Sequence, residues 1–200
     1  DAKVETDSTV KGQKVTVSYQ VFPGQRYYAD SVYFISRDTA IERILRQTRK
    51  SSYLQKGVPI EISAYRAEVG RVMRMLRDSG YFFFNSSYID QLEVIRDTLG
   101  SNQVDIRFIV LPQEDGSSHQ RFRVGDIRIF PSFENASNQQ ALYRSTVDSI
   151  EFVRSTKELS IRPEVILEQV YLSEKAPTNL SLQEKTRQQL SQLDLYRYIS

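Results

Sequence analysis

The stretch LRDSGYFFF, residues 76–84, decides the fold, because a helical segment ends in it and four aromatic residues follow at once. Gly80 comes just after the last apolar residue of the helical pattern, where helices commonly close on a residue with positive φ. We therefore expect an abrupt helix end, with rings from Tyr81–Phe84 packed in the core and one ring left exposed. The apolar positions upstream recur at threes and fours on one helix face: Ile62, Tyr65, Val69, Val72, Met73 and Leu76.

A repeated strand pattern flanks this helix. Residues 14–23, KVTVSYQVFP, and residues 103–112, QVDIRFIVLP, both alternate apolar and polar residues and both end in proline. Such alternation is typical of half-buried strands. A further helix is expected near Thr39, because TAIE has the form of a capping box. The complete unit is therefore predicted as strand, helix, helix, strand, strand.

A second copy of the unit begins at residues 120–129, QRFRVGDIRI, which match QRYYADSVYF at residues 25–34. We expect an insertion at about 134–160, in which TVDSIEFV and ELSI form a hairpin across RSTK. The helical pair then returns as RPEVILEQVYL and LQEKTRQQL, and Asp194 replaces the glycine at the helix end. The aromatic exit is expected to correspond to Leu195, Tyr196 and Tyr198.

Composition and residue types argue against several functions. The 200 residues carry a net charge of +2, which does not indicate nucleic acid as the main partner, and the absence of cysteine excludes disulfides and thiolate metal sites. His119 is the only histidine and lies in a Gly/Ser loop, while Asp90, Glu93 and Asp97 have no second ligand type beside them. We therefore expect no catalytic residue, no metal and no cofactor, and we predict that the chain is not an enzyme.

The succession of elements resembles POTRA domains, the periplasmic modules of BamA/TamA-type outer-membrane assembly proteins. The likeness is carried by PGQRYYADSVYF (23–34), EVGRVMRMLRDSGYFFF (68–84), SYIDQLEVIRDT (87–98), QVDIRFIVLP (103–112), IRPEV (161–165) and KTRQQLSQLDLYRYI (185–199). The long insertion and Asp194 depart from the usual pattern and suggest a Bacteroidetes-like member.

This resemblance implies an α+β fold of tandem POTRA modules (β-α-α-β-β), each a three-stranded mixed sheet covered on one face by two helices. Residues 1–24 then form the C-terminal hairpin of a preceding module, and residues 25–114 form a complete module. Residues 115–200 form the following module, truncated before its last strands. We expect neighbouring modules to meet through a small polar contact near Gln25–Tyr28 and Gln120–Arg123 that acts as a hinge.

The resemblance also implies a periplasmic arm attached to an outer-membrane β-barrel, which guides unfolded outer-membrane or secreted polypeptides and docks accessory lipoproteins. A sheet edge with free N–H and C=O groups can add a strand from another chain. In this family the strand after GYF lies at that edge. The predicted partner-binding residues are Tyr88, Ile89, Asp90, Gln91, Leu92, Glu93 and Val94.

Other functions remain open at this point. A two-partner secretion transporter or a cell-division scaffold would contain similar modules. A KH-type domain, which binds nucleic acid, also combines two helices with three strands, but it needs a GXXG loop that this sequence lacks.

Overall fold

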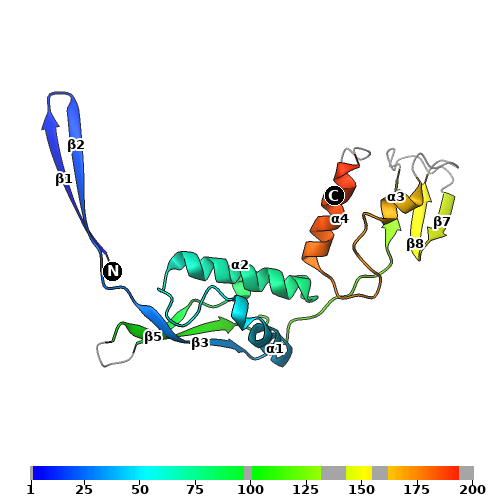
Figure 1. The fold of residues 1–200 in the computed structure, drawn as a ribbon, viewed down its shortest axis with the longest axis horizontal. Helices are drawn as coiled ribbons and strands as arrows, with labels where there is room; N and C mark the ends of the chain where they lie inside the picture. Colours follow the sequence, from blue (N-terminus) through cyan, green and yellow to red (C-terminus); the bar gives the residue numbers. More distant parts are fainter. Residues whose placement is uncertain (1, 97–100, 132–142, 155–161, 194–200) are drawn as a thin grey trace.

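A computed structural model describes residues 2–96, 101–131, 143–154 and 162–193. Figure 1 shows an N-terminal hairpin, a central unit that runs from β3 to β5, and a C-terminal unit that runs from β6 to α4. The strands are β1 (Lys3–Lys11), β2 (Lys14–Phe22), β3 (Tyr28–Ser36), β4 (Glu93–Arg96), β5 (Gln103–Val110), β6 (Arg128–Ile129), β7 (Tyr143–Val147) and β8 (Ile150–Arg154). The helices are α1 (Thr39–Gln47), α2 (Ile62–Asp78), α3 (Pro163–Leu167) and α4 (Leu180–Gln192), with short 3₁₀ turns η1 (Arg49–Ser51) and η2 (Ser86–Tyr88).

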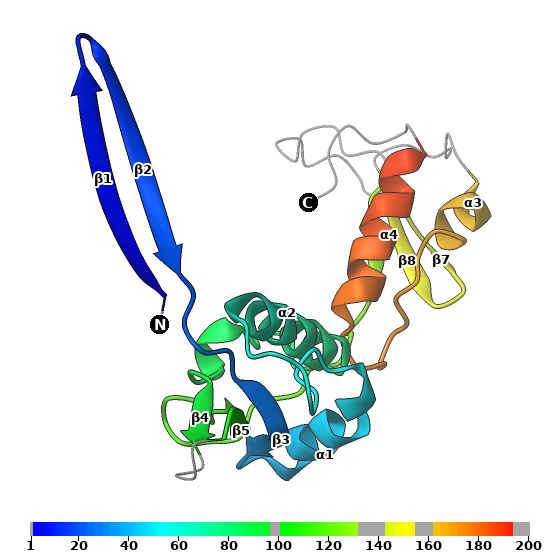
Figure 2. The same ribbon diagram turned by 60° about the vertical axis from the view of Figure 1, so that its left-hand side comes forward.

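The N-terminal hairpin is amphipathic and extends away from the central unit (Figure 2). β1 and β2 pair antiparallel from Lys3 opposite Phe22 to Lys11 opposite Lys14. Because side chains alternate between the two faces, the apolar residues gather on one of them. That face carries Val4, Val10, Val15, Val17, Tyr19 and Val21, which are 45–69% exposed. Within the described residues, this apolar face has no cover.

The central unit has the predicted order β3-α1-α2-β4-β5. Its sheet has the strand order β3-β5-β4, in which β3 is parallel and β4 antiparallel to the middle strand β5. A bulge between Ala29 and Val32 shifts the register of β3 by one residue, so that both side chains are buried. The predicted α+β class and the mixed three-stranded sheet are confirmed.

Both helices of the central unit cover the same face of its sheet. The core cluster combines residues of α1, α2 and β5. Apolar residues gather on one face of each helix, which has 3.6 residues per turn, and they pack against the apolar residues at every second position of the strand. Its fully buried members include Ile41, Leu45, Val72, Leu76, Ile106, Phe108 and Val110. Ile62, which was predicted to lie on the buried stripe of α2, is 72% exposed instead, because it lies in the first turn.

The cap of α1 lies one residue earlier than predicted. The carboxylate of Asp38 accepts from the N–H groups of Ala40 at 2.9 Å and Ile41 at 3.2 Å. Aspartate is a strong N-cap because its charge meets the positive end of the helix dipole. The helix therefore begins with Thr39 inside it, and the capping-box interpretation of TAIE is wrong.

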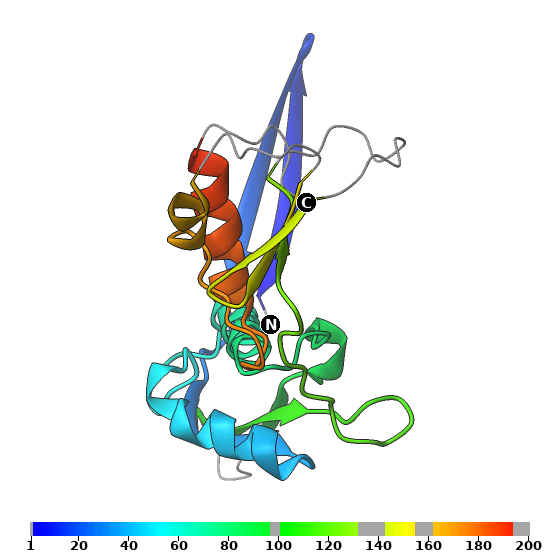
Figure 3. The same cartoon turned by 90° about the vertical axis from the view of Figure 1, so that its right-hand side faces the viewer.

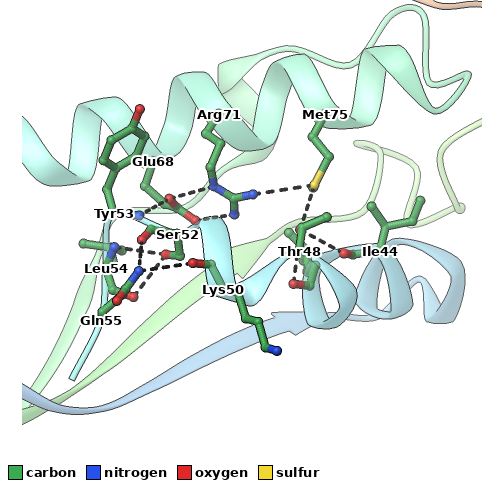
Figure 4. A network of polar contacts seen from close by, with 11 residues as sticks. Ile44, Thr48, Lys50, Ser52, Tyr53, Leu54, Gln55, Glu68, Arg71 and Met75 are labelled. Carbon is green, nitrogen blue, oxygen red and sulfur yellow. Dashed lines mark hydrogen bonds and ion pairs between the residues drawn. The ribbon is translucent and has the colours of Figure 1, made fainter.

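A buried ion pair holds the connection between α1 and α2 (Figure 4). The fully buried Glu68 accepts from Arg71 Nε at 3.0 Å and Nη2 at 2.6 Å, and from the N–H of Tyr53 at 2.9 Å. Arg71 and Thr48 also contact the sulfur of Met75, at 3.7 Å and 2.9 Å. A charge buried inside a small domain needs such partners. Glu68 therefore fixes the connecting loop to α2.

The end of α2 agrees with the prediction made from residues 76–84. Gly80 has φ +101°, and the N–H of Tyr81 donates to Leu76 O at 3.1 Å across the last turn. Tyr81 and Phe84 are buried, whereas Phe83 is 68% exposed, which confirms a core role with one ring outside. The chain does not continue into a strand at once, because η2 and an irregular segment precede β4.

The C-terminal unit has the same kind of three-stranded mixed sheet as the central unit, but its three strands all precede its helices in the sequence. Its strand order is β6-β8-β7, with β6 parallel and β7 antiparallel to β8. TVDSIEFV, predicted as one strand of a hairpin across RSTK, instead contains a turn at Asp148 and Ser149, which have φ of 49° and 70°, while RSTK beyond Arg154 lies outside the described residues. Two positive φ values in a two-residue loop match the turns that favour tight hairpins. ELSI, at residues 158–161, lies outside the described residues.

The helices α3 and α4 follow this sheet. Ile166 of α3 is fully buried against Phe152, and Leu190 of α4 packs beside them. In chain order, both helices of this unit therefore come after its three strands. In the central unit, the two helices come between the first strand, β3, and the other two strands, β4 and β5. The predicted exit residues from Asp194 onward lie outside the described residues. No helix in the described ranges is both long and apolar enough to cross a bilayer.

Candidate functional site

The predicted edge of the central sheet is occupied by β4. Residues Glu93–Arg96 pair with Arg107–Val104 of β5, and within the described residues no strand lies on the other side of β4. Half of the backbone N–H and C=O groups of such an edge strand point away from its neighbour. In the described ranges, the outer backbone groups of β4 therefore have no strand partner.

The regular strand begins later than the predicted binding segment. Of the seven predicted residues, only Glu93 and Val94 lie in β4. Tyr88 ends η2, and Ile89 forms an isolated antiparallel bridge with Val110 of β5. Asp90, Gln91 and Leu92 lie between this bridge and the strand. The segment therefore follows β5 along its length, but its pairing is interrupted at Gln91 and Leu92.

The first part of this segment is fixed to the core. The N–H of Asp90 donates to Ile109 O at 3.0 Å, and the hydroxyl of Tyr65 donates to Asp90 O at 2.8 Å. Ile89 is 8% exposed. Burial raises the pKa of Tyr65, and the nearby carboxylate of Asp90 raises it further, so the hydroxyl keeps the proton that it donates. These contacts position the strand that follows.

His119 is buried, although the sequence places it in a polar loop. Its ring makes edge contacts with Phe84 and Tyr88, at centroid distances of 5.1 Å and 4.6 Å. Its Nε2 lies 2.8 Å from Leu111 O. His119 therefore ties the chain after β5 to the segment before β4, which is a structural role.

The carboxylates near the edge are dispersed. Glu93 lies 3.7 Å from Arg107 on the neighbouring strand, and the Asp90 carboxylate accepts from the N–H of Gln91 at 2.8 Å. Asp97 lies outside the described residues. In the described ranges, no three His, Cys, Asp or Glu side chains come together as a metal site would require.

A groove runs beside the edge, between β4 and the start of α2. It encloses about 320 Å³ and is lined by Gln25, Arg26, Tyr27, Pro59, Ile60, Glu61 and Val94. Val94 is 41% exposed there. Because side chains alternate along a strand, a strand added to β4 would direct every second side chain towards this side of the sheet. The edge thus combines free backbone groups with a partly apolar groove.

The opposite edge of the sheet is covered where β3 begins. Gly57 donates to Ala29 O at 2.7 Å, Ala29 donates to Val58 O at 3.0 Å, and Ile60 donates to Tyr27 O at 2.9 Å. The loop that makes these bonds is the one that Glu68 fixes to α2. The first residues of β3 are therefore protected, whereas β4 is open.

The central and C-terminal units meet at the end of α2. The carbonyl oxygen of Gly80 accepts from the N–H of Phe122 at 2.8 Å and from the hydroxyl of Thr178 at 3.2 Å, and Arg121 Nε donates to Ser79 O at 3.0 Å. Of the two ranges predicted for the contact between modules, Gln120–Arg123 lies at this joint, whereas Tyr28 of Gln25–Tyr28 donates to Asn102 O within the central unit at 2.8 Å. Phe122 also packs edge-on against Phe83 at 5.1 Å, so this contact is not purely polar.

Sequence reasoning missed the second half of this joint. The carboxylate of Asp78 accepts from Ser181 N at 2.8 Å and Oγ at 2.7 Å, and Arg74 pairs with Glu184 at 2.9 Å. The N-terminal end of α4 therefore lies against α2 (Figure 3). One signal was present, because an acidic residue at the C-terminal end of a helix opposes the helix dipole and suggests an external partner.

Comparisons with known proteins give similarities at low sequence identity. No protein-family model and no curated protein match the chain. POTRA domains 3–5 of BamA from Haemophilus influenzae match at 15% identity with a TM-score of 0.48, over 100% of this chain and 64% of that one. BamA from Haemophilus ducreyi lacking POTRA domains 1–3 matches at 19% identity and a TM-score of 0.35, over 63% of this chain and 20% of that one. POTRA domains 1–3 of Omp85 from Anabaena match at 14% identity and a TM-score of 0.31, over 99% and 66%. The chain thus spans less than two thirds of the length of the first of these.

Proposed function

We propose that this chain is a periplasmic polypeptide-binding scaffold of an outer-membrane protein assembly or translocation machine, and that it captures strands of other proteins at β4. The observation that carries the proposal is the asymmetry of the central sheet. β4 has a neighbour on one side only, while loop residues 57–60 cover the start of β3. Backbone pairing tolerates many sequences, which suits a protein that handles many clients.

The proposed partners are unfolded outer-membrane or secreted polypeptides and accessory lipoproteins, and the proposed full-length protein carries an outer-membrane β-barrel. This part rests on the sequence resemblance to POTRA domains. The Bacteroidetes affiliation and the alternatives of a two-partner secretion transporter or a cell-division scaffold stay predictions.

We also propose that the N-terminal hairpin belongs to a preceding module. Val15, Val17, Tyr19 and Val21 align with Val104, Ile106, Phe108 and Val110 of β5. The β5 residues are 1–2% exposed beneath α1 and α2, whereas the hairpin residues are 45–69% exposed. An antiparallel sheet with one apolar face normally packs that face. A helix pair equivalent to α1 and α2 would supply the cover.

Binding of a short neutral peptide tests strand capture at β4. The probe is a peptide of about ten residues that alternates valine and threonine, titrated into the ¹⁵N-labelled chain. We expect the largest amide shift changes at Glu93–Arg96. A peptide methylated on alternate backbone nitrogens should lose binding, because it cannot donate to the edge.

A matched pair of variants locates the site. Val94→Glu places a charge in the groove and should weaken binding about tenfold, the effect of losing one buried valine contact. Val165→Glu is the control, since Val165 of α3 has nearly the same exposure, 40% against 41%. Shift changes centred away from β4, or equal binding of the methylated peptide, would contradict strand capture at this edge.

A further inference from the structure

The surface formed by α1 and η1 is strongly basic. Residues 37–50 contain five cationic and two acidic side chains, a net charge of +3. The rest of the chain contains 22 cationic and 23 acidic side chains, a net charge of −1. The nearly balanced charge of the whole chain therefore conceals one basic surface, made of Arg37, Arg43, Arg46, Arg49 and Lys50.

All five cations of this basic surface are exposed, and most of them have no partner of opposite charge. Arg46 pairs with Glu42 at 2.7 Å, and the carboxylate of Asp38 caps α1. Within the described residues, no carboxylate pairs with Arg37, Arg43, Arg49 or Lys50. Both acidic side chains of the segment are thus engaged, and four cations are free to meet an external anion.

The core holds α1 with its basic side outward. Ile41 and Leu45, on the opposite side of the helix, are fully buried. Arg43 and Arg46 are three residues apart, so they lie together on the exposed side. Figures 1, 2 and 3 agree that the N-terminal hairpin and the C-terminal unit both extend away from the side of the central unit on which α1 lies. A flat surface can therefore approach α1 without meeting either of them.

Exposed apolar side chains flank the basic surface. Tyr33 and Ile35 of β3 are 49% and 39% exposed, and they line a groove of about 480 Å³ together with Arg46 and Arg49. Tyr53, which follows η1, is 54% exposed. Tyrosine favours the boundary between water and lipid, because its ring is apolar and its hydroxyl is polar.

The groove keeps an excess of positive charge despite two acidic residues. Glu42 and Asp105 both line it. Glu42 is paired with Arg46, and Arg107 of β5 lines the groove as well as Arg49. Three guanidinium groups thus face two carboxylates there.

We propose that the basic surface of α1 and η1 binds the face of an anionic phospholipid membrane. Four of its five cations are arginines, and a guanidinium group donates two parallel hydrogen bonds to phosphate oxygens. Exposed tyrosine and isoleucine side chains beside these arginines match a headgroup layer that has an apolar interior beneath it. The association is peripheral, and it is independent of strand capture at β4.

Vesicles that differ only in charge test this proposal. The chain is sedimented with vesicles of phosphatidylcholine alone or with about 30% phosphatidylglycerol, and we expect binding only to the second kind. Raising the salt from about 50 to about 300 mM should release the chain, because the cations are exposed. A headgroup spin label in the vesicles should broaden the amide signals of Thr39–Ser51 more than those of Tyr143–Arg154.

A matched pair of double variants locates the surface. Arg43→Glu/Arg49→Glu should weaken vesicle binding at least about 25-fold, because each cation near an anionic leaflet is worth about fivefold. Arg66→Glu/Arg187→Glu makes the same change in total charge on exposed positions of α2 and α4 and should leave binding within about threefold. Val94→Glu, which tests β4, should weaken vesicle binding no more than this control, so failure of peptide capture at β4 leaves the result intact. Urea denaturation checks that each variant is folded.

Several outcomes would overturn the proposal. These are equal binding to vesicles with and without phosphatidylglycerol, equal weakening by the two double variants, or strongest broadening outside Thr39–Ser51. Binding of a polyglutamate peptide to this surface without binding of vesicles would assign it to an acidic protein partner instead.

Discussion

Replacing Gly80 by alanine should weaken both the end of α2 and the joint between the units. At φ +101° an L-residue is strained by about 1–2 kcal/mol. The added Cβ would also lie 3.3 Å from Phe122 O and 3.4 Å from Pro177 Cβ, which is close enough to displace Phe122, whose N–H donates to the Gly80 carbonyl. Loss of that hydrogen bond adds about 1 kcal/mol. We therefore expect the free energy of unfolding in urea to fall by about 2–3 kcal/mol.

Gly70→Ala is the matched control within the same helix. Gly70 lies in the middle of α2, and a Cβ added there meets no atom within 4 Å. Alanine should therefore stabilise α2 by about 0.5–1 kcal/mol, the opposite sign. The reasoning is refuted if Gly80→Ala leaves the free energy of unfolding unchanged, or if both variants shift it in the same direction.

Three further predictions concern the central unit and its joint. Glu68→Gln should lower the free energy of unfolding by about 3 kcal/mol, because the charge of Arg71 would then lack its carboxylate partner. Urea denaturation measures this change. Asp78→Ala should lower the free energy of unfolding by about 1 kcal/mol through loss of the hydrogen bonds from Ser181 N and Oγ, and it should broaden the distribution of inter-unit distances in solution scattering, whereas unchanged scattering would show that this contact does not hold the joint. For Tyr65, the pKa is raised in the folded state, so its contribution to stability is present below pH about 10 and is lost as pH rises through the folded pKa. Tyr65→Phe should therefore reduce the alkaline loss of stability, measured by denaturation at increasing pH, and an unchanged pH slope would contradict the shift.

The sequence predicted the central unit well because its signals are local. The period of α2, the corner at Gly80 and the alternation of β5 each follow from a few neighbouring residues, and all three are confirmed. Glu68 could not be foreseen as a buried residue, because its partners Arg71 and Tyr53 include one from a distant loop. The pattern of residues along one helix does not show that a distant loop will supply a hydrogen bond to a buried charge.

The start of β4 was misplaced for a related reason. The resemblance to POTRA domains placed a strand at Tyr88–Val94, but Asn85 caps η2 through Ser87 N at 2.9 Å, and the 3₁₀ turn delays the pairing. The error in the C-terminal unit has another origin. Asp148 and Ser149 adopt positive φ in a two-residue turn, so TVDSIEFV forms two paired strands where the sequence predicted one.

Asp78 shows how the two units depend on each other. It is the last residue of α2, where a carboxylate faces the negative end of the helix dipole, so the residue disfavours its own helix. The same carboxylate accepts from Ser181 N and Oγ at the N-terminal end of α4, where negative charge is favoured. Asn179, the N-cap of α4, donates in turn to the backbone carbonyl of Asp78 at 3.1 Å, so the two helix ends bond to each other in both directions. An unfavourable placement in one unit is thus offset only when the other unit is docked, which argues for a defined joint in place of the hinge expected from the sequence.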